Sequence, residues 1–188
     1  WRHLLLLPEC GTITIYNRSQ YEEVLVVKVH PEILTQSQKL PVELTKDLDK
    51  VWQQRYQDIT NFEKYLYHNG IRVVKFFLNV SQKEQGQQLI ERIEDPAKNW
   101  KFEENDIKER AFWHEYMSAY EDAINATATE KAPWYVVPAD KKNMRLIVGQ
   151  ILIEELKKLD MSYPETTPER QLTLKKLLTT IQEQDKDL

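Results

Sequence analysis

A nearly continuous apolar run at residues 72–80 constrains the fold of this 188-residue chain more than any other feature. Its β-branched, aromatic and aliphatic side chains are Val73, Val74, Phe76, Phe77, Leu78 and Val80. A strand with one face in water alternates apolar and polar side chains, whereas a run this continuous is typical of a parallel strand that is covered on both faces. The run therefore predicts a parallel sheet enclosed by helices.

Segments with helical periodicity flank this strand. Residues 47–68 place apolar side chains at the 3-, 4- and 7-residue spacings of one helix face, and Gly70 follows as a C-cap signal. After the strand, Ser81 and Glu84 form a capping-box pattern, which predicts the start of a helix that ends before Pro96. The strand is therefore expected to lie between two helices.

The C-terminal half continues the alternation of helices and strands. The predicted elements are helices at residues 104–127, 143–159 and 170–184, a short strand at residues 134–137, and a proline-bearing linker at residues 163–168. Strands that are separated by long helices indicate βαβ units. We therefore expect an α/β fold with an open parallel sheet.

The N-terminal part supplies candidate site residues. Residues 11–16 predict a short buried strand, and the polar residues Asn17, Arg18 and Ser19 follow it directly, with Glu22 nearby. Ligands of open α/β sheets bind beyond the carboxyl ends of the strands, so these side chains are expected to line a crevice. The adjoining segments are expected to form the end of a helix at residues 1–7 and a turn-rich or helical stretch at residues 24–29.

Composition excludes several classes of function. The net charge of −4 argues against sequence-independent nucleic-acid binding, which needs a basic face. The single cysteine, Cys10, excludes an intramolecular disulfide and a four-cysteine zinc site, and it fits a reducing cytoplasm. The four histidines have no metal-ligand spacing. No apolar stretch reaches about 18 residues, so no membrane-spanning helix is expected.

Four blocks of the sequence, in the same order, resemble the polyphosphate kinase 2 family. The first, YNRSQYEEVLVVKVHP at residues 16–31, is similar to the Walker B region of the branch that phosphorylates nucleoside mono- and diphosphates. The other blocks lie at residues 69–81, 95–110 and 119–145. The resemblance spans residues 1–160 and implies a three-layer α/β sandwich of the P-loop kinase type, with a helical lid at about residues 92–110. Residues 161–188 then form a linker and a C-terminal helix.

The resemblance also implies a reaction and a set of site residues. Inorganic polyphosphate is expected to donate a phosphoryl group to AMP, ADP or the guanine equivalents, with Mg²⁺ as cofactor. Arg18 and Arg92 are expected to stabilise transition-state charge, since a guanidinium binds phosphate oxygens in a bidentate way. The expected nucleotide-binding residues are Asn17, Glu22 and Arg145, the expected polyphosphate-binding residues are Lys28, Lys98 and Lys101, and Glu22 is the candidate metal ligand.

The phosphate-binding loop of P-loop enzymes has no counterpart in this chain. Its pattern, G-x-x-x-x-G-K-[ST], needs glycines that the four present, Gly11, Gly70, Gly86 and Gly149, do not provide. The chain also starts at Trp1 rather than at Met, which we interpret as a start inside a longer protein. The 188 residues alone are therefore expected to be nearly inactive.

Structural alternatives accompany these functional interpretations. Arg18 has the alternative of a surface ion pair with Glu22 or Glu23, and the acids around the predicted lid give the alternative of an ordinary solvated helical pair. His30 before Pro31 is interpreted as a turn residue. The aromatic stripe is interpreted as core; it consists of Phe112, Trp113, Tyr116 and Tyr120.

Two other classes of function stay open. A chain without the P-loop is compatible with binding polyphosphate or nucleotide without catalysis. A different P-loop kinase, related to thymidylate or adenylate kinases, would use ATP as donor. Strand packing is also compatible with a homo-oligomer.

Overall fold

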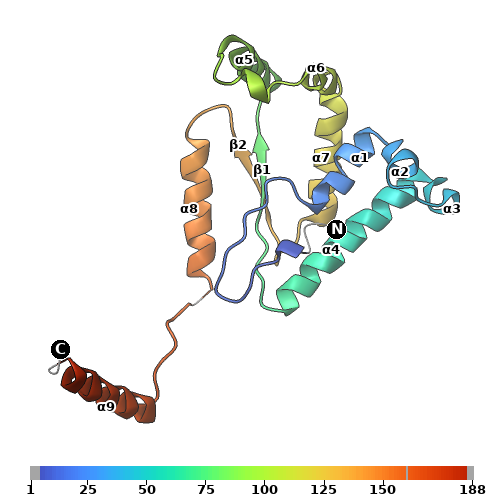
Figure 1. Cartoon of the computed structure of the whole chain (residues 1–188). Helices are drawn as coiled ribbons and strands as arrows, with labels where there is room; N and C mark the ends of the chain where they lie inside the picture. The colour runs from blue at the N-terminus through green and yellow to red at the C-terminus, as the bar shows by residue number, and fades with distance from the viewer. Residues whose placement is uncertain (1–4, 160, 186–188) are drawn as a thin grey trace. The chain divides into compact units, whose positions relative to one another are not determined.

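The computed structural model describes residues 5–159 and 161–185 of the chain (Figure 1). These residues belong to two compact units, residues 1–148 and residues 149–188, which we describe separately. The expected division between a kinase-like domain at residues 1–160 and a C-terminal extension stays a prediction.

A parallel pair of strands forms the sheet of the first unit. β1 (Lys75–Asn79) pairs with β2 (Trp134–Pro138), so that Lys75 lies opposite Trp134 and Phe77 opposite Val136. β1 lies inside the strand predicted at residues 72–80, and β2 extends the strand predicted at residues 134–137 by one residue; their parallel pairing confirms the expected topology. β1 is shorter than the apolar run at residues 72–80, because only residues 75–79 of that run pair with β2.

Helices make up most of the chain (Figure 1). In the first unit they are η2 (Gln20–Glu23), α1 (Val26–Val29), α2 (Ile33–Gln36), α3 (Val42–Thr45), α4 (Leu48–His68), α5 (Gln82–Glu94), η3 (Asn99–Lys101), α6 (Glu104–Arg110) and α7 (Trp113–Thr127). α8 (Met144–Lys157) begins in the first unit and ends in the second, and α9 (Pro168–Gln184) belongs to the second. No helix of the described residues is long and apolar enough to cross a membrane.

Local capping explains where the main helices begin and end. The Asp47 carboxylate accepts a hydrogen bond from the Lys50 N–H at the start of α4, and Gly70 follows its end with φ at +80°. The Ser81 hydroxyl likewise accepts from the Glu84 N–H at the start of α5. These caps confirm the predicted helix boundaries, which depend only on neighbouring residues.

Two apolar clusters stabilise the first unit, and both use one face of α4. The first joins η2, α4 and α7 and consists of Tyr21, Val24, Leu25, Ile59, Ala119 and Ala123. The second joins α1, α2 and α4 and consists of Val27, Leu34, Val51 and Trp52. The long amphipathic helix predicted at residues 47–68 therefore organises the packing of the whole N-terminal half.

A buried polar network lies between these helices and the sheet. The Lys75 ammonium donates hydrogen bonds to Glu63 Oε2 (2.6 Å), to the Tyr21 hydroxyl (3.0 Å) and to the Thr127 carbonyl (2.9 Å). The Tyr21 hydroxyl in turn donates to Glu63 Oε1 at 2.8 Å. The indole N–H of Trp134 donates to the Thr127 hydroxyl at 2.9 Å. These bonds satisfy all three donors of the ammonium, and the network joins β1, β2, η2, α4 and α7.

Burial shifts the titration of this network. It raises the pKa of Glu63 and lowers the pKa of Lys75, while the attraction between the two groups opposes both shifts. Burial, together with the negative charge of Glu63, raises the pKa of Tyr21. Both charges are therefore retained in the interior because each compensates the other.

The N-terminal strand prediction is wrong. Residues 11–16 adopt no regular secondary structure, and the side chains of Ile13 and Ile15 are 69% and 83% exposed. A strand needs a neighbour that provides backbone partners, and no strand of the described residues pairs with this segment. The expected helix end at residues 1–7 lies partly outside the described residues, whereas the stretch at residues 24–29 is helical, as one of its two alternatives proposed.

Residues 104–127 form two helices rather than the single helix that the periodicity predicts. α6 ends at Arg110 and α7 begins at Trp113, because the backbone of Phe112 leaves the helical region with ψ at 25°. The Phe112 ring then contacts His30 edge to face, with ring centroids 4.9 Å apart. A contact with a residue some 80 positions earlier thus accompanies the break, and no local pattern announces it.

Lys75→Met should destabilise the first unit by about 3–5 kcal/mol, because it leaves the Glu63 carboxylate buried without a counter-charge. The double variant E63Q/K75M removes both charges and keeps an acceptor for the Tyr21 hydroxyl. It should recover more than half of the loss. Urea unfolding of the two variants and the parent measures both values, and a Lys75→Met variant as stable as the parent would contradict this account of the network.

Candidate functional site

The carboxyl ends of β1 and β2 meet at one edge of the sheet, where ligands of α/β proteins bind. β1 leads through Val80 into the N-terminus of α5, and β2 leads into Asp140. Asp140 Oδ1 accepts a hydrogen bond from the Ser81 backbone N–H at 2.6 Å. This carboxylate therefore joins the two strand ends.

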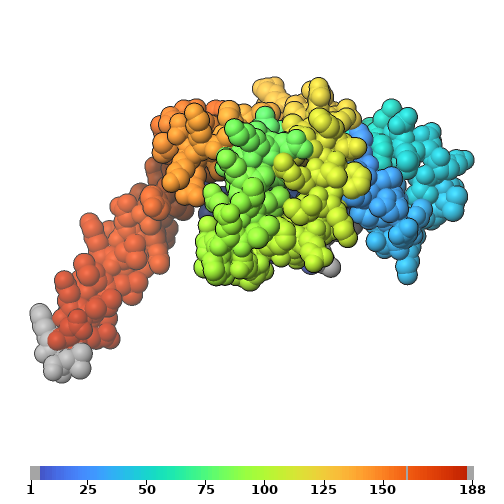
Figure 2. Space-filling view, turned by 90° about the horizontal axis from the view of Figure 1, so that it is seen from above, coloured from blue at the N-terminus to red at the C-terminus, as the bar shows by residue number. Residues whose placement is uncertain are grey.

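A cavity of about 400 Å³ opens beside this edge. Its walls come from the end of β1, from α5, from α6 and from α7. The apolar part of the lining consists of Phe77, Leu78, Val80, Leu89, Trp113, Met117 and the rings of Tyr116 and Tyr120. Figure 2 shows this side of the molecule, with the side chains of α5 in green beside those of α6 and α7 in yellow-green.

The cavity is also lined by two arginines and two acids. Arg92 Nη1 lies 3.6 Å from Asp106 Oδ2, and both side chains remain more than one-third exposed. Arg110 is held more firmly, because its Nη1 donates to the Gln82 carbonyl and to Gln85 Oε1, both at 2.8 Å. Of the two guanidiniums, Arg92 has the weaker protein contact and is therefore the one available to an anion.

Gly86 makes room for Arg110. A Cβ atom at this helical position would lie 3.2 Å from Arg110 Nη2 and 3.4 Å from its Cζ. The guanidinium therefore packs directly on the backbone of α5. A glycine in a helix interior costs about 1 kcal/mol relative to alanine, and here the cost accompanies a close contact between α5 and α6.

Asn17 and Arg18 shortly precede η2 and Glu22 belongs to it, and none of the three lines the cavity. Arg18 is exposed and has φ at +69°, a conformation that costs a residue other than glycine about 1–2 kcal/mol. Burial raises the pKa of Tyr120 most strongly, the Glu22 carboxylate adds to the rise, and the positive charge of Arg18 opposes it. Because the ring of Tyr120 lines the cavity, Arg18 and Glu22 lie within electrostatic range of its wall.

The alternative pairing of Arg18 with Glu23 is not observed. Arg55 Nη1 donates to the carbonyl and to Oε2 of Glu23, each at 2.7 Å, and Arg55 Nη2 donates to Gln38 Oε1. Among the described residues, Arg18 and Glu22 form no ion pair within 4.0 Å with each other or with another side chain. The guanidinium of Arg18 is thus exposed without an ion-pair partner among the described residues.

The other predicted cations lie elsewhere. Lys28 lies 2.6 Å from Asp122 Oδ2 and donates to the Tyr56 hydroxyl at 3.1 Å, so both contacts favour a structural role. Lys98 lies 3.2 Å from Asp95 Oδ2, and Lys101 lies over the ring of Trp100. Both lysines are exposed on the connection between α5 and α6 and do not line the cavity.

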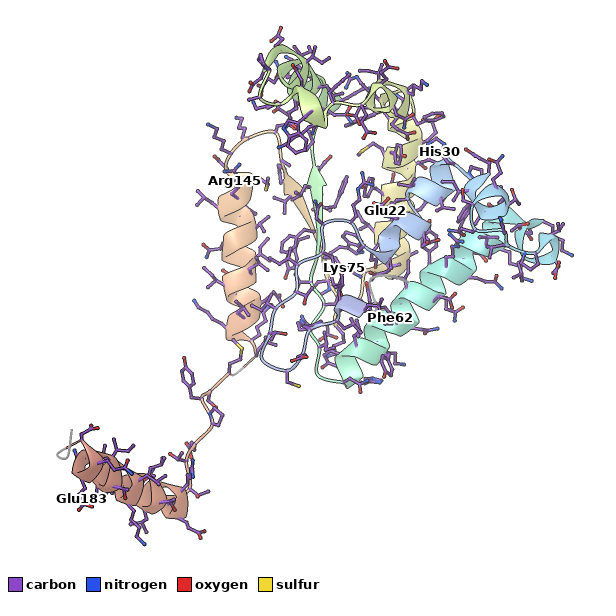
Figure 3. The ribbon with its side chains drawn as sticks, viewed as in Figure 1. Glu22, His30, Phe62, Lys75, Arg145 and Glu183 are labelled. Atoms are coloured by element: carbon purple, nitrogen blue, oxygen red, sulfur yellow. The ribbon has the colours of Figure 1, made fainter. Side chains whose placement is uncertain are left out.

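Arg145 is separated from the residues with which the sequence groups it. It is exposed in the first turn of α8, whereas Glu22 belongs to η2. In Figure 3 the two strands lie between the labelled residues Arg145 and Glu22. Of the nucleotide-binding set proposed from the sequence, Asn17 and Glu22 are neighbours in the chain, whereas Arg145 lies apart from Glu22.

The sequence analysis missed the contact between His30 and Glu109. His30 Nε2 lies 2.9 Å from Glu109 Oε2, which also accepts a hydrogen bond from the Tyr116 hydroxyl at 2.7 Å. Partial burial raises the pKa of Glu109, but the bonds from His30 and Tyr116 outweigh it, and the net shift is downward. This cluster fastens α6 to the end of α1. His30 is therefore more than the turn residue that the sequence predicts.

The prediction that the aromatic stripe forms core is wrong for most of its members. Trp113, Tyr116 and Tyr120 line the cavity, and Phe112 is 36% exposed against His30. Tyr120 alone is largely enclosed, because its ring stacks on Phe77 with centroids 4.4 Å apart. Helical periodicity identifies a face that meets other elements, but it does not tell whether side chains or a cavity lie there.

One signal for the buried network was visible in the sequence. Glu63 falls on the apolar face of the helix at residues 47–68, four positions after Ile59 and three before Leu66. Lys75 likewise interrupts the apolar strand. An acid and a base at two such positions indicate a buried ion pair, since an unpaired charge there would be costly.

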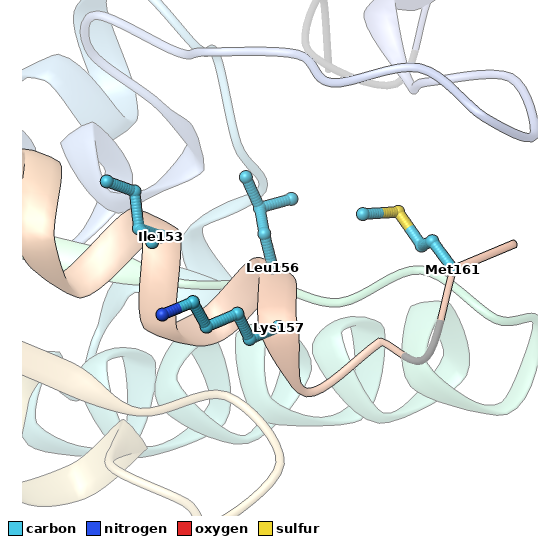
Figure 4. A pocket seen from close by; sticks show the side chains of 4 residues that line it. All are labelled: Ile153, Leu156, Lys157 and Met161. Atoms are coloured by element: carbon cyan, nitrogen blue, oxygen red, sulfur yellow. The ribbon is translucent and has the colours of Figure 1, made fainter.

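A second hollow, of about 380 Å³, lies in the C-terminal unit (Figure 4). Ile153, Leu156, Lys157 and Met161 line it. One lysine among three apolar side chains provides no convergent polar groups, and none of the predicted site residues contributes. We therefore assign the candidate site to the cavity of the first unit.

Comparison with known proteins identifies the family of this chain. The family model for polyphosphate kinase 2 matches residues 1–164. The ADP-polyphosphate phosphotransferase of Rhodopseudomonas palustris is 50% identical over 176 residues, which cover 93% of this chain and 60% of that protein. The AMP/ADP-polyphosphate phosphotransferase of Meiothermus ruber is 43% identical over 166 residues, which cover 88% of this chain and 57% of that protein.

A solved structure extends the similarity to the fold. The crystal structure of polyphosphate kinase 2 from Arthrobacter aurescens TC1 matches with a TM-score of 0.76 and 37% identity, over 93% of this chain and 59% of that chain. Parallel strands with polar side chains beyond their carboxyl ends, and helices beside them, define an α/β protein of the P-loop kinase type. More narrowly, the chain belongs to the polyphosphate kinase 2 family. It spans about 60% of the length of these relatives.

The contact between His30 and Glu109 should contribute about 1 kcal/mol to stability, because it is a charge-assisted bond whose carboxylate is one-third exposed. A double-mutant cycle with His30→Ala and Glu109→Gln measures the coupling through urea unfolding. Hydrogen exchange of residues 104–110 should rise in both single variants and should not rise further in the double variant. Additive effects on stability and exchange would show that the two residues act separately.

Proposed function

We propose that this chain forms part of a polyphosphate-dependent nucleotide phosphotransferase, which transfers a phosphoryl group from inorganic polyphosphate to AMP or ADP. Family membership carries the proposal, together with the names of the two relatives, an ADP-polyphosphate and an AMP/ADP-polyphosphate phosphotransferase. The exposed guanidinium of Arg18, which lies within electrostatic range of Tyr120 in the cavity wall, supports the same reaction. Guanine nucleotides are equivalent acceptors in this proposal.

The reaction exchanges one phosphorus–oxygen bond for another. A phosphate oxygen of the acceptor attacks the terminal phosphorus of polyphosphate, and the bond from that phosphorus to the next bridging oxygen breaks. The electron pair leaves with the shortened polyphosphate. Because little covalent help is needed, catalysis depends on positioned charge around the transferring group.

We assign the transition-state charge to Arg18 and Arg92. Arg18 is exposed and lies within electrostatic range of Tyr120, while Arg92 lines the cavity with only a long contact to Asp106. A guanidinium offers two parallel donors to phosphate oxygens, which a lysine cannot provide. We place the acceptor nucleotide near Asn17 and Glu22, with Arg145 and Lys28 as weaker candidates for contacts with the substrates.

Mg²⁺ is the cofactor that this chemistry requires, and Glu22 is our candidate ligand. No group of three or more histidines, cysteines or carboxylates that could hold a metal ion occurs among the described residues. Mg²⁺ in kinases is commonly bound by one or two carboxylates together with phosphates and water, so the single half-buried carboxylate of Glu22 fits. When bound, the ion would neutralise charge on the phosphate oxygens.

We propose that residues 92–110 act as a lid over polyphosphate. This lid segment carries Lys98 and Lys101 on its exposed part and Arg92 at its start. The ion pairs of Arg92 with Asp106 and of Lys98 with Asp95 lie within the segment itself. The ion pair of Glu109 with His30 joins the segment to the end of α1, and a partly exposed pair of this kind is worth little. A segment held in this way can open and close at small cost, and closure would exclude water from the reaction.

The single cysteine suggests to us that the protein works in the cytoplasm.

The choice of phosphoryl donor tests the proposal. The protein expressed from the complete coding sequence should convert AMP to ADP, or ADP to ATP, with polyphosphate and Mg²⁺, and should do so much more slowly when ATP replaces polyphosphate for AMP. Chromatography of the nucleotides measures both rates. A preference for ATP would identify a different P-loop kinase, and tight binding of both substrates without turnover would identify a binding protein.

Arg18→Ala should lower the transfer rate by about 10²–10³-fold, the loss typical of removing one electrostatic contact to a developing charge. Lys39→Ala is a matched control, because Lys39 is the other described residue besides glycine with a positive φ, at +52°, and it too is an exposed cation. Both variants should unfold at similar temperatures. Equal activity of the two variants would contradict a catalytic role for Arg18 and would indicate that the residue is structural.

Replacing Lys98 and Lys101 by alanine together should weaken polyphosphate binding about tenfold and reduce its dependence on salt concentration, because fewer counterions are exchanged. Affinity for AMP should change much less, since we place the nucleotide near Glu22. The matched control replaces Lys175 and Lys176 in α9, which removes the same charge elsewhere. Calorimetry at two salt concentrations measures both ligands, and equal losses for both would contradict a role specific to polyphosphate.

A further inference from the structure

α9 is the one long helix of the described residues that buries none of its own side chains. It runs from Pro168 to Gln184, and the Thr167 hydroxyl caps it by accepting a hydrogen bond from the Arg170 N–H at 3.2 Å. It lies beyond residues 1–164, the part that the family model matches. None of its residues is buried. Its function is therefore not explained by the candidate site.

The helix nevertheless carries an apolar stripe. Leu174, Leu177, Leu178 and Ile181 follow the 3-, 4- and 7-residue spacings of a single face, and they are 42%, 49%, 56% and 54% exposed. From its spacing alone, such a stripe is expected to be buried. A helix of about this length is only marginally stable in water by itself, so a partner that covers the stripe would stabilise it.

Charged side chains mark the two ends of the same stripe. Arg170 lies four residues before Leu174, and Asp185 lies four residues after Ile181, so both fall on the face of the stripe at about 100° of rotation per residue. Their charges are opposite. The remaining charges of this helix, Glu169, Lys175, Lys176 and Glu183 (labelled in Figure 3), lie off the stripe by the same rotation.

We propose that α9 pairs in antiparallel orientation with α9 of a second copy of this chain. About a twofold axis that passes between Leu177 and Leu178, Leu174 faces Ile181 of the second copy, and Leu177 faces Leu178 of the second copy. Arg170 then faces Asp185 of the second copy. Every stripe residue meets an apolar partner and each terminal charge meets its opposite, which is the self-complementarity that a twofold interface requires.

The charges select this orientation. In a parallel pair each residue faces its own counterpart, so Arg170 would face an arginine and Asp185 would face an aspartate. The antiparallel pair turns both repulsions into attractions and also opposes the two helix dipoles. A contact between two helices of this length buries less than about 1,000 Å², so the association is expected to be weak, with a dissociation constant in the micromolar range or above.

Sedimentation velocity of the 188-residue chain over a range of concentrations tests the pairing. The parent should associate reversibly, and Leu178→Ser should raise the dissociation constant at least about tenfold, because the substitution removes an apolar contact twice in the dimer. Leu172→Ser is the matched control. Leu172 is 62% exposed and lies on the face away from the stripe, so its replacement should leave association unchanged.

Charge reversal tests the orientation. Arg170→Asp and Asp185→Arg should each weaken association, since each places like charges together at both ends of the pair. The double variant R170D/D185R restores opposite charges and should associate as the parent does. In a parallel pair the double variant would gain nothing over the single ones.

Each remaining outcome overturns the proposal. A parent that is monomeric throughout the concentration range has no such interface. Equal effects of Leu178→Ser and Leu172→Ser would remove the stripe from the interface. If Leu178→Ser instead lowers the unfolding temperature of a monomer, the stripe packs against another segment of its own chain.

Discussion

The buried ion pair between Lys75 and Glu63 is the interaction on which the rest of the first unit depends. A lone charge at either position would be strongly destabilising, so β1 and α4 must come together before either residue can be buried. Tyr21, Thr127 and Trp134 complete the hydrogen bonds and bring η2, α7 and β2 to the same point. Tyr21 directly precedes Glu22 in η2, so the network that closes the core also fixes the segment that carries Glu22.

The helices α5 and α6 beside the cavity are held by contacts of a different kind. α5 and α6 are held by Arg110 over Gly86, by the long contact between Arg92 and Asp106, and by the bond from His30 to Glu109. Most of these groups are partly exposed, where each contact contributes little free energy. The wall of the cavity that α5 and α6 form is therefore held by contacts that are mostly weak. Mobile elements of enzymes are commonly drawn from such regions of low local stability.

Errors of the sequence analysis occur where a distant residue decides the structure. The apolar residues at positions 11–16 satisfy every local criterion for a strand, yet they are exposed, because a strand needs a neighbour. The helix at residues 104–127 breaks at Phe112, where the ring contacts His30 of a distant segment. The stripe of α9 satisfies the criterion for burial and remains exposed in a single chain. In all three cases the local pattern shows which structure a segment can form, and contacts with a distant segment decide which structure it adopts.

The sequence by itself determined the helices α4 and α5 with their caps, the two parallel strands and the polar cluster at residues 17–22, because these features depend on side chains close together in the chain. It also carried the family resemblance. The tertiary structure alone decided which charges are left for a ligand: Glu23 is taken by Arg55 and Lys28 by Asp122, whereas Arg18 keeps its guanidinium exposed. Ion pairing depends on distances of a few ångströms between residues that are tens of positions apart, and no sequence spacing encodes such distances.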